Sequence, residues 1–404
     1  MKVALVHDYL KEFGGAERVL MVLHEMFPDA PIYTAFVTPG STAEKQFEDK
    51  LREDGSNAKI ITSWANIFIR NFNLFSPLRF LVPLIWESFD FSGYDLVILS
   101  SSGYLTKPAR IPRNVRVICY CHTPPRFLYG YQTALEWQRY WPVKIYGYIL
   151  GHFLRLYDFL GAQRVDQFIA NSHNVAARIK KFYRKNSVVV YPPVETSRIA
   201  VASQGETPRA SGVSPYKRGD LGAYPAKGGG GSQDSSRGEG SYFLVVGRIA
   251  GAKGVDLAME AANKLGVPLK IVGEYAGIKW EKKKIENLQS SNVEFLGRVP
   301  DNQLYNLYAH AKAFLAIGHD EDFGITPVEG LAAGTPVVAY ASGGYLETII
   351  EGKTGTFFAE YNAESLAEAM ERVQGLKFKV EDLRKQAEKF SRERFIKEIK
   401  SLTT

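Results

Sequence analysis

The stretch that decides the fold begins with an apolar run at residues 313–317 (AFLAI) and continues into residues 321–329 (EDFGITPVE). The apolar run predicts a strand. A helix is expected to begin near Thr326, because Pro327 suits a first helical turn. A helix start presents unpaired backbone N–H groups and the positive end of the helix dipole, which together favour a bound anion such as a diphosphate. The stretch therefore predicts an anion site at the end of a strand.

Two acidic residues flank this helix start at different depths. Glu321 lies in the loop ahead of the helix, where it can meet a sugar hydroxyl. Glu329 lies about one turn inside, where it can accept hydrogen bonds from ribose hydroxyls. Acids near a helix N-terminus also stabilise the dipole with no other role. Both interpretations stay open at this point.

Outward from this stretch, short apolar runs alternate with longer helical patterns. Strands are expected at residues 3–7, 32–36, 59–62, 96–100, 115–120, 167–171 and 188–191, and again at 242–246, 269–272, 293–296, 313–317 and 337–340. Helices are expected between them, among others at residues 16–26, 174–182, 255–264 and 302–311. Alternation of this kind is typical of parallel sheets covered on both faces. Two such series predict an α/β protein with two doubly wound, Rossmann-like domains.

The division of the chain follows from a break in this pattern. Residues 196–240 are rich in Gly, Ser, Pro and charge, include the run GGGGS at 228–232, and predict a flexible linker or insertion. Whether it is natural or engineered stays open. We expect an N-terminal domain at 1–195, a C-terminal domain at 241–378, and an amphipathic helix within 379–404 that needs a surface to pack on.

A second candidate site follows the first strand of the C-terminal domain. Gly247 and Arg248 come directly after that strand, and Lys253 and Gly254 precede the next helix. The Arg fork and the Lys charge suit phosphate oxygens, and fixed cations stabilise the negative charge that grows on a departing diphosphate. The alternative is a pair of solvated basic residues.

Two further motifs lie at strand ends of the N-terminal domain. His7-Asp8-Tyr9 is followed by Gly14-Gly15-Ala16-Glu17, where two glycines allow close backbone approach to a phosphate or sugar. The spacing is not GxGxxG, which makes a dehydrogenase the least favoured function. The run from Cys121 to Pro125 (CHTPP) places His122 where it would face the cleft between the domains. A plain turn and a structural His are the respective alternatives.

Composition sets the outer limits. The chain has 404 residues, 45% apolar and 23% charged, with a net charge of +7; it suits two domains of roughly 150–200 residues each. The two cysteines, Cys119 and Cys121, are expected to be buried free thiols in a reducing cytosol. No apolar run reaches the ~18 residues of a membrane span. We expect a cytoplasmic protein, soluble or peripheral to the membrane, with no nucleic-acid partner.

A metal and a resident cofactor are not expected. The acidic run at residues 320–322 (DED) formally matches an Asp-x-Asp metal signature, and His319 adjoins it. The sequence offers no second group of ligands at a recognisable metal spacing. We therefore predict no essential metal.

The region from Ile67 to Trp86 combines aromatic and aliphatic residues with Arg70 and Arg79. Such content is typical of a membrane-surface or lipid-acceptor site. The alternative, slightly favoured, is a buried core helix with a loop. Pro77 and Pro83 argue against one uninterrupted helix.

Taken together, the motifs resemble glycosyltransferase family 4, the retaining group with the GT-B fold. The resemblance rests on the run from Glu321 to Glu329, on Arg248 with Lys253 five residues later, and on the Gly14 and His122 motifs. The runs at 334–339 (GTPVVA) and 342–344 (SGG) contribute to it. It covers nearly the whole chain apart from the linker. It implies two domains facing a cleft, with the last helices crossing back to the first domain.

The resemblance also implies roles for individual residues. Arg248 and Lys253 would neutralise the donor diphosphate. Glu329 would hold the ribose, and Glu321 would contact the donor sugar. His122 would sit beside the sugar hydroxyls. Further donor contacts, made largely by backbone, would come from Gly14, Gly15, Gly273, Arg298, Val299, Gly324, Ile325 and Thr326.

Two departures from the family pattern affect the site. The loop between the Arg and the Lys often reads like Val-Pro-Tyr-Lys-Arg, but here residues 249–254 read IAGAKG. An echo, SPYKR at 214–218, stands inside the linker. The long linker is the second departure. Lys253 is taken as the working residue because it keeps the spacing from Arg248.

The functional expectation is a retaining hexosyltransferase. Bacterial or archaeal mannosyltransferases of surface-polysaccharide synthesis are the nearest subgroup in resemblance, which favours GDP-mannose as donor and a glycan or lipid-linked acceptor. UDP-sugars stay open, as does a non-catalytic nucleotide-sugar-binding protein. An epimerase or a phosphorylase on the same fold is a further alternative.

Overall fold

The computed structural model describes residues 1–53, 58–68, 77–131, 141–204, 241–249, 253–275, 283 and 285–404. The chain forms two compact units. Unit 1 contains Met1–Pro193 and Phe395–Thr404, and unit 2 contains Val194–Arg394. Each unit has its own sheet and its own core.

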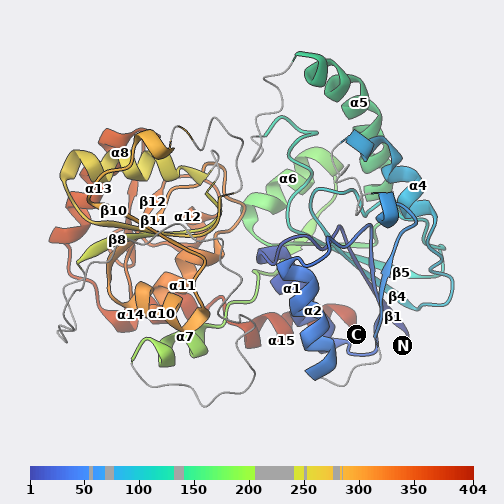
Figure 1. The fold of residues 1–404 in the computed structure, drawn as a ribbon. Coiled ribbons are helices and arrows are strands. Elements are labelled where there is room, and N and C mark those ends of the chain that lie inside the picture. Colours follow the sequence, from blue (N-terminus) through green and yellow to red (C-terminus); the bar gives the residue numbers. More distant parts are fainter. Residues whose placement is uncertain are drawn as a thin grey trace. The chain divides into compact units, whose positions relative to one another are not determined.

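The sheet of unit 1 is fully parallel. Its strand order is β3-β2-β1-β4-β5-β6-β7. Figure 1 labels the neighbouring strands β1, β4 and β5. The strands are β1 (Val3–His7), β2 (Ile32–Thr34), β3 (Ile60–Thr62), β4 (Leu96–Ser101), β5 (Arg116–Cys121), β6 (Gln167–Ala170) and β7 (Ser187–Val189). The order reverses direction between β1 and β4. In open α/β sheets, ligands bind beyond the strand ends at such a switch point.

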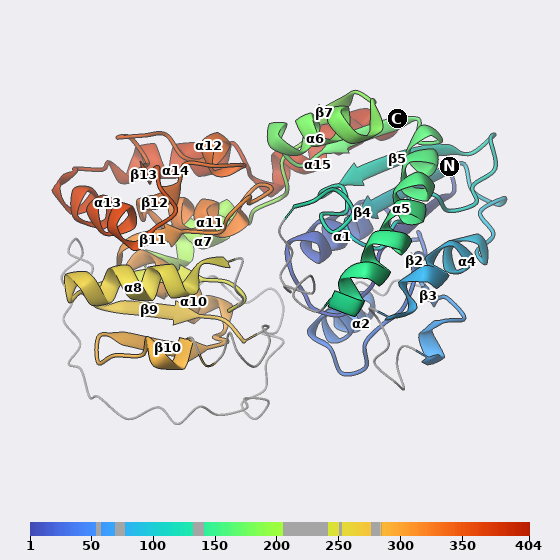
Figure 2. The ribbon, with the colours of Figure 1, turned by 90° about the horizontal axis from the view of Figure 1, so that it is seen from above.

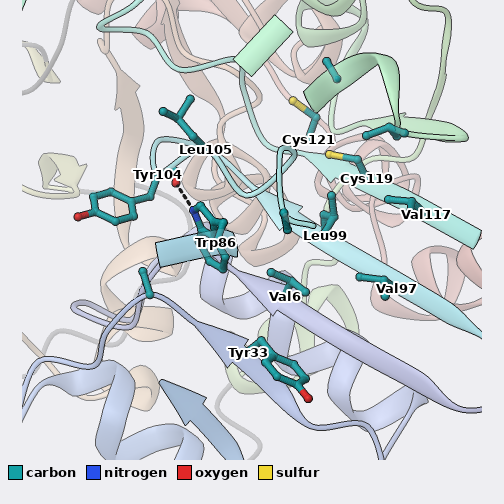
Figure 3. Close-up of a cluster of buried hydrophobic side chains, with 14 of the residues drawn as sticks. Val6, Tyr33, Trp86, Val97, Leu99, Tyr104, Leu105, Val117, Cys119 and Cys121 are labelled. Carbon is teal, nitrogen blue, oxygen red and sulfur yellow. Dashed lines mark hydrogen bonds between the residues drawn. The ribbon is translucent and has the colours of Figure 1, made fainter. Parts of the chain in front are cut away.

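Helices cover both faces of this sheet. They are α1 (Gly15–Met26), α2 (Thr42–Glu53), α4 (Val82–Glu87), α5 (Trp141–Gln163), α6 (His173–Tyr183) and α15 (Arg392–Thr403), with a 3₁₀ turn η1 (Pro77–Leu81). One core joins α1, α2 and α15 to the sheet through side chains such as Leu20, Phe47 and Phe395. The other core holds Trp86, whose Nε1 donates to the Tyr104 carbonyl at 2.8 Å (Figure 3).

The sheet of unit 2 is also fully parallel. Its order is β10-β9-β8-β11-β12-β13, so its direction reverses between β8 and β11. The strands are β8 (Tyr242–Val246), β9 (Leu269–Val272), β10 (Val293–Gly297), β11 (Ala311–Ala316), β12 (Val337–Tyr340) and β13 (Gly355–Phe358). The helices are α7 (Thr196–Ala202), α8 (Val255–Leu265), α10 (Asp301–Ala309), α11 (Ile325–Ala333), α12 (Tyr345–Thr348), α13 (Ala363–Gly375) and α14 (Val380–Glu388). Figure 1 shows α8 and α13 on one face and α7, α10, α11 and α14 on the other.

The predicted fold class is confirmed, since both sheets are parallel and both are covered by helices. Every strand expected from the sequence is present, with its ends within two residues of the expected ones. Strand β13 was not predicted. It is a four-residue edge strand with the sequence GTFF, which begins with a glycine and contains a single β-branched residue.

Two segment boundaries need correction. The linker was expected from residue 196, but Thr196–Ala202 forms α7, which buries Ile199. The single helix expected from residue 380 is two helices, α14 and α15. The break has a physical cause. The Val194 N–H donates to the Phe390 carbonyl at 3.0 Å, and the Arg392 N–H donates to the Val194 carbonyl at 3.1 Å, so this backbone pairs outside a helix.

Some predictions fall on residues outside the described part of the chain. They are the GGGGS run, the echo at 214–218, and residues 250–252 between Arg248 and Lys253. Arg70 belongs to the same group.

Candidate active site

Unit 2 carries charged groups at its switch point, beyond the ends of β8 and β11. Lys253 Nζ donates to Glu321 Oε2 at 2.7 Å, and the two side chains are 37% and 22% exposed. The pair lies over the backbone of Gly318, where a Cβ would come within 3.0 Å of Glu321 Oε2. The structure therefore brings together a cation and an acid that are 68 residues apart in sequence.

The start of α11 stands beside this pair. Its N-cap, Gly324, has a φ of 89°, and a Cβ there would lie 2.8 Å from Tyr345 Cε1. Only glycine combines this left-handed backbone with the close approach of Tyr345. The N–H groups of Ile325 and Thr326 belong to the first turn, where a helix supplies no acceptor. They are the donors available to an anion.

Glu329 is buried one turn further along α11. It is 3% exposed and accepts a hydrogen bond from Tyr308 Oη at 2.9 Å. Burial of a carboxylate requires such partners. The bond orients the carboxyl group. The ribose contact expected of Glu329 stays a prediction.

Arg248 is the second residue after β8 and has an exposed side chain. Next to it, Gly247 meets Gly273 at the end of β9. A Cβ at Gly273 would lie 1.8 Å from the Gly247 carbonyl oxygen, so there is no room for a side chain at Gly273. Arg298 and Val299 are half-buried and follow β10, which β9 and β8 separate from β11. Arg298 and Val299 lie at the same edge of the sheet as Lys253 and Glu321, but farther from the switch point between β8 and β11.

Unit 1 carries a chain of buried polar groups at its own switch point. His7 and Ser100 are register partners on β1 and β4. Ser100 Oγ lies 3.0 Å from His7 Nδ1 and 2.8 Å from His122 Nε2. His7 Nε2 lies 3.4 Å from Glu17 Oε1, and Glu17 Oε2 accepts the Gly14 N–H at 2.9 Å. Gly14 is the N-cap of α1, and Gly15 begins that helix.

The His122 ring is held neutral by its surroundings. Burial, together with the repulsion of a charge on His7, lowers the pKa of His122 to about 3. The ring is 8% exposed. A neutral imidazole offers one donor and one acceptor nitrogen. His122 can therefore orient a hydroxyl but does not supply a positive charge near neutral pH.

Asp8, in the same motif as His7, organises the loop after β4. Its Oδ2 accepts the backbone N–H groups of Ser102, Gly103 and Tyr104 at 2.8, 2.6 and 3.0 Å, and the Ser102 hydroxyl at 2.7 Å. Four donors on one buried carboxylate oxygen fix the loop beside the His7 strand end.

Sequence analysis missed two groups in these arrangements. Ser100 joins His7 to His122, and Tyr345 packs against Gly324 while its hydroxyl accepts the Gly318 N–H at 3.2 Å. A signal for Ser100 existed in the polar run SSSG that ends the apolar strand at 96–100. For Tyr345 the signal was its place directly after the SGG run.

The acidic run at 320–322 does not form a cation site with its neighbours. His319 Nδ1 pairs with Asp320 at 3.2 Å, and its ring stacks on Tyr340 at 5.6 Å. Within the described ranges, no group of three or more His, Cys, Asp or Glu residues is placed to hold a metal ion. Cys119 and Cys121 are both free and buried.

Two parallel Rossmann-like sheets with these strand orders define the GT-B class of fold. Structural neighbours agree. A sucrose-phosphate synthase from Thermosynechococcus elongatus superposes with a TM-score of 0.70 at 17% identity, covering 100% of this chain and 98% of that one. The Anabaena protein HepE, solved in complex with UDP and glucose, superposes with a TM-score of 0.65 at 16% identity, covering 100% of both chains.

The chain belongs to glycosyltransferase family 4, and it is a glycosyltransferase. The family model described as Glycosyltransferase Family 4 matches residues 13–198, and the model described as Glycosyl transferases group 1 matches residues 232–393. The resemblance stated from the motifs is thereby confirmed.

Curated relatives include mannosyltransferases. An alpha-1,3/1,6-mannosyltransferase ALG2 from Dictyostelium discoideum is 25% identical over 323 residues, covering 72% of this chain and 70% of that protein. Its counterpart in Schizosaccharomyces pombe is 24% identical over 385 residues, covering 88% and 70%. A segment of 81 residues is 38% identical to the lipopolysaccharide core biosynthesis mannosyltransferase LpcC of Rhizobium leguminosarum bv. viciae, covering 20% and 22%.

Proposed function

We propose that this glycosyltransferase moves a hexose, mannose from GDP-mannose, to a hydroxyl of a glycan or lipid-linked acceptor in cell-surface polysaccharide synthesis, with retention of the anomeric configuration. The observation that carries the proposal is the Lys253–Glu321 pair at 2.7 Å beside the start of α11. The names of the curated relatives favour mannose as the sugar. The UDP complex of HepE keeps a UDP-sugar as the alternative donor.

The charges of unit 2 suit departure of a nucleoside diphosphate. The bond between the anomeric carbon and the phosphate oxygen breaks, and negative charge grows on the diphosphate. Lys253 and Arg248 stabilise that charge, together with the N–H groups of Ile325 and Thr326. The acceptor oxygen forms the new bond on the same face of the sugar, and its proton passes to a phosphate oxygen. Glu321 contacts the sugar, and Glu329 holds the ribose.

The donor is tested by thermal stabilisation of the full chain with GDP-mannose, GDP, UDP-glucose and UDP. We expect GDP-mannose to raise the unfolding temperature most, and product analysis on a lipid-linked acceptor to show transferred mannose. Stabilisation by UDP-sugars alone would replace the proposed donor. Binding of a donor with neither transfer nor hydrolysis would favour the non-catalytic alternative.

The proposed chemistry uses fixed side-chain cations and no essential metal. Turnover is therefore expected to persist after treatment with EDTA, because Arg248 and Lys253 supply the charge on the leaving group. Loss of turnover in EDTA with recovery on adding Mg²⁺ would contradict this part of the proposal.

The acceptor proposal includes peripheral contact with the membrane through unit 1. Part of the region from Ile67 to Trp86 fits a buried core helix, and part of it fits a membrane-surface site. Val82, Ile85 and Trp86 are buried, as a core helix requires. Other large apolar side chains of the region and its flank are exposed, namely Ile67, Phe68, Phe80, Leu84 and Trp64. Within the described residues, no helix is both long enough and apolar enough to cross a bilayer.

Helix α5 enlarges this exposed apolar surface. Its outward residues recur at helical spacing and are mostly large and apolar: Trp141, Ile145, Tyr148, Ile149, Phe153, Leu156 and Leu160. Tyr157 Oη donates to the Pro83 carbonyl at 3.4 Å, which places α5 beside α4 (Figure 2). Exposed basic residues on α5, Lys144 and Arg155, suit anionic headgroups.

Vesicle co-sedimentation tests this contact. Replacing Ile149 and Phe153 together by Ser should weaken binding to anionic vesicles by about tenfold or more, since two large apolar side chains leave the interface. The matched control replaces Leu346 and Ile350, exposed apolar residues of unit 2, and should bind like the parent. Equal binding by both variants would exclude α5 as the contact.

A further inference from the structure

A continuous line of buried polar atoms runs through unit 1 from the start of α1 to His122. Its members stand on α1, on the neighbouring strands β1 and β4, and directly after β5. The separations are 3.4 Å from Glu17 to His7, 3.0 Å from His7 to Ser100, and 2.8 Å from Ser100 to His122. His7 is 2% exposed and Ser100 is 1% exposed. Because these groups are buried away from solvent, their hydrogen bonds keep the same partners.

The direction of these hydrogen bonds follows from the acid at one end. The ionised Glu17 carboxylate only accepts, and its Oε2 already holds the Gly14 N–H at 2.9 Å. Its Oε1 faces His7 Nε2, so that nitrogen carries the hydrogen. A lone pair at this position would set two acceptors against each other.

The remaining groups then follow in order. With its hydrogen on Nε2, neutral His7 presents a lone pair at Nδ1, which accepts the Ser100 hydroxyl hydrogen. A hydroxyl has one hydrogen, so Ser100 Oγ must accept from His122 Nε2. His122 is left with an unprotonated Nδ1. No described residue forms a hydrogen bond with that nitrogen.

The opposite direction requires a second proton on His7. An imidazolium at 2% exposure would have Glu17 as its counter-ion, at 3.4 Å, and burial of an ion is unfavourable without close pairing. The neutral arrangement satisfies every nitrogen of His7 without burying a cation.

We propose that Glu17, His7 and Ser100 are positioning residues that hold His122 as the Nε2–H tautomer, so that Nδ1 accepts a hydrogen bond from a hydroxyl of the transferred sugar. The tautomer is a property of unit 1 alone. The contact of His122 with the sugar rests on the proposed function. The glycine motif thus serves His122 through Glu17, whose carboxylate caps the α1 backbone and orients His7 at the same time.

Nitrogen NMR of the imidazole rings tests the tautomer without any activity measurement. In full-length protein labelled at histidine, with His122 assigned through the signals lost in His122→Gln, we expect a protonated Nε2 and an unprotonated Nδ1 at neutral pH. The burial that lowers the pKa of His122 predicts that this signal does not titrate between pH 5 and pH 8. A proton on Nδ1 in the parent protein would overturn the proposal.

Glu17→Gln provides the sharper experiment, because it reverses the line of donors. The Gln oxygen keeps the Gly14 N–H, which turns the NH₂ group towards His7 Nε2. His7 then carries its hydrogen on Nδ1, Ser100 donates to His122 Nε2, and the His122 proton moves to Nδ1. An unchanged His122 signal in a folded Glu17→Gln protein would refute the coupling.

Kinetics complete the test. Ser100→Ala should lower kcat/KM about tenfold, the equivalent of one hydrogen bond of ~1.4 kcal/mol, and Ser100→Thr should restore it. Thr34→Val is the matched control, because Thr34 is the buried register partner of His7 on its other side, in β2. It should leave kcat/KM and the His122 signal unchanged. If His122→Ala retained full activity while the tautomer was as expected, the proposed sugar contact would fail and the positioning chain would stand.

Discussion

The candidate sites of the two units, each at the switch point of its sheet, differ in how their polar groups are held. In unit 2, Lys253 and Glu321 form a partly exposed ion pair at the start of a helix. In unit 1, His7, Ser100 and His122 are buried and lie along one hydrogen-bonded line. A partly exposed cation can exchange its partner for a phosphate oxygen at low cost, whereas buried groups joined by hydrogen bonds keep one arrangement. We infer that unit 2 handles changing charge and that unit 1 handles orientation.

The largest expected effect tests the rigidity of unit 1. Asp8→Ala should lower the free energy of unfolding by about 3–5 kcal/mol, because three backbone N–H groups and a hydroxyl lose a charged acceptor. Urea unfolding followed by intrinsic tryptophan fluorescence measures it. Trp86, one of the five tryptophans, donates to the carbonyl of Tyr104 in the same loop. Asp166→Ala is the control. Asp166 accepts one backbone N–H, from Val117, at 2.8 Å, so the loss should be about 1 kcal/mol. Equal losses would mean that the loop after β4 is not held by Asp8.

The next effect tests the charge of unit 2. Lys253→Ala should lower kcat about 100-fold, as loss of one fixed group that stabilises developing charge does. Stability should change by less than about 1 kcal/mol, because the ion pair is partly exposed. Steady-state kinetics with GDP-mannose and urea unfolding are the measurements.

The control for this charge is Lys264, which lies in the last turn of α8, the helix that Lys253 precedes. Lys264 forms an exposed pair with Glu364 at 3.0 Å at the other end of α8. Lys264→Ala should leave turnover unchanged. A similar loss of turnover in both variants would show that net charge, rather than the position of Lys253, is what matters.

The two units also differ in how much of the candidate site could be predicted from the sequence. The unit 2 residues follow local signals: a strand, a Gly, a charge and a helix start lie within a few positions of one another. The contact between Lys253 and Glu321 was not visible, because it depends on β8 and β11 being neighbours in the sheet. Strand order is a long-range property, and periodicity does not encode it.

The hydrogen-bonded line in unit 1 was harder to predict from sequence, because it also depends on long-range strand pairing. His7 and Ser100 are 93 residues apart and meet because β1 and β4 pair in a specific register. A shift of one residue would turn Ser100 to the other face of the sheet. The sequence marked His7 and His122 as polar residues at strand ends, but the serine between them carried no signal beyond a polar run. The register of β1 against β4, rather than the composition of these strands, brings the hydrogen-bonded residues together.

The smallest expected effect is at Glu329. It tests whether unit 2 also contains a buried polar group that orients the substrate, as proposed for unit 1. Glu329 is buried and oriented by Tyr308, and we propose that its other oxygen holds the ribose. Glu329→Gln should raise the KM for GDP-mannose about tenfold and change kcat less, because ribose contacts are the same in the ground state and the transition state. Tyr308→Phe removes the orienting bond and should raise KM about threefold. If kcat fell while KM stayed constant, Glu329 would act on the reacting centre. The division into a charge-handling unit and an orienting unit would then have to be redrawn within unit 2 itself.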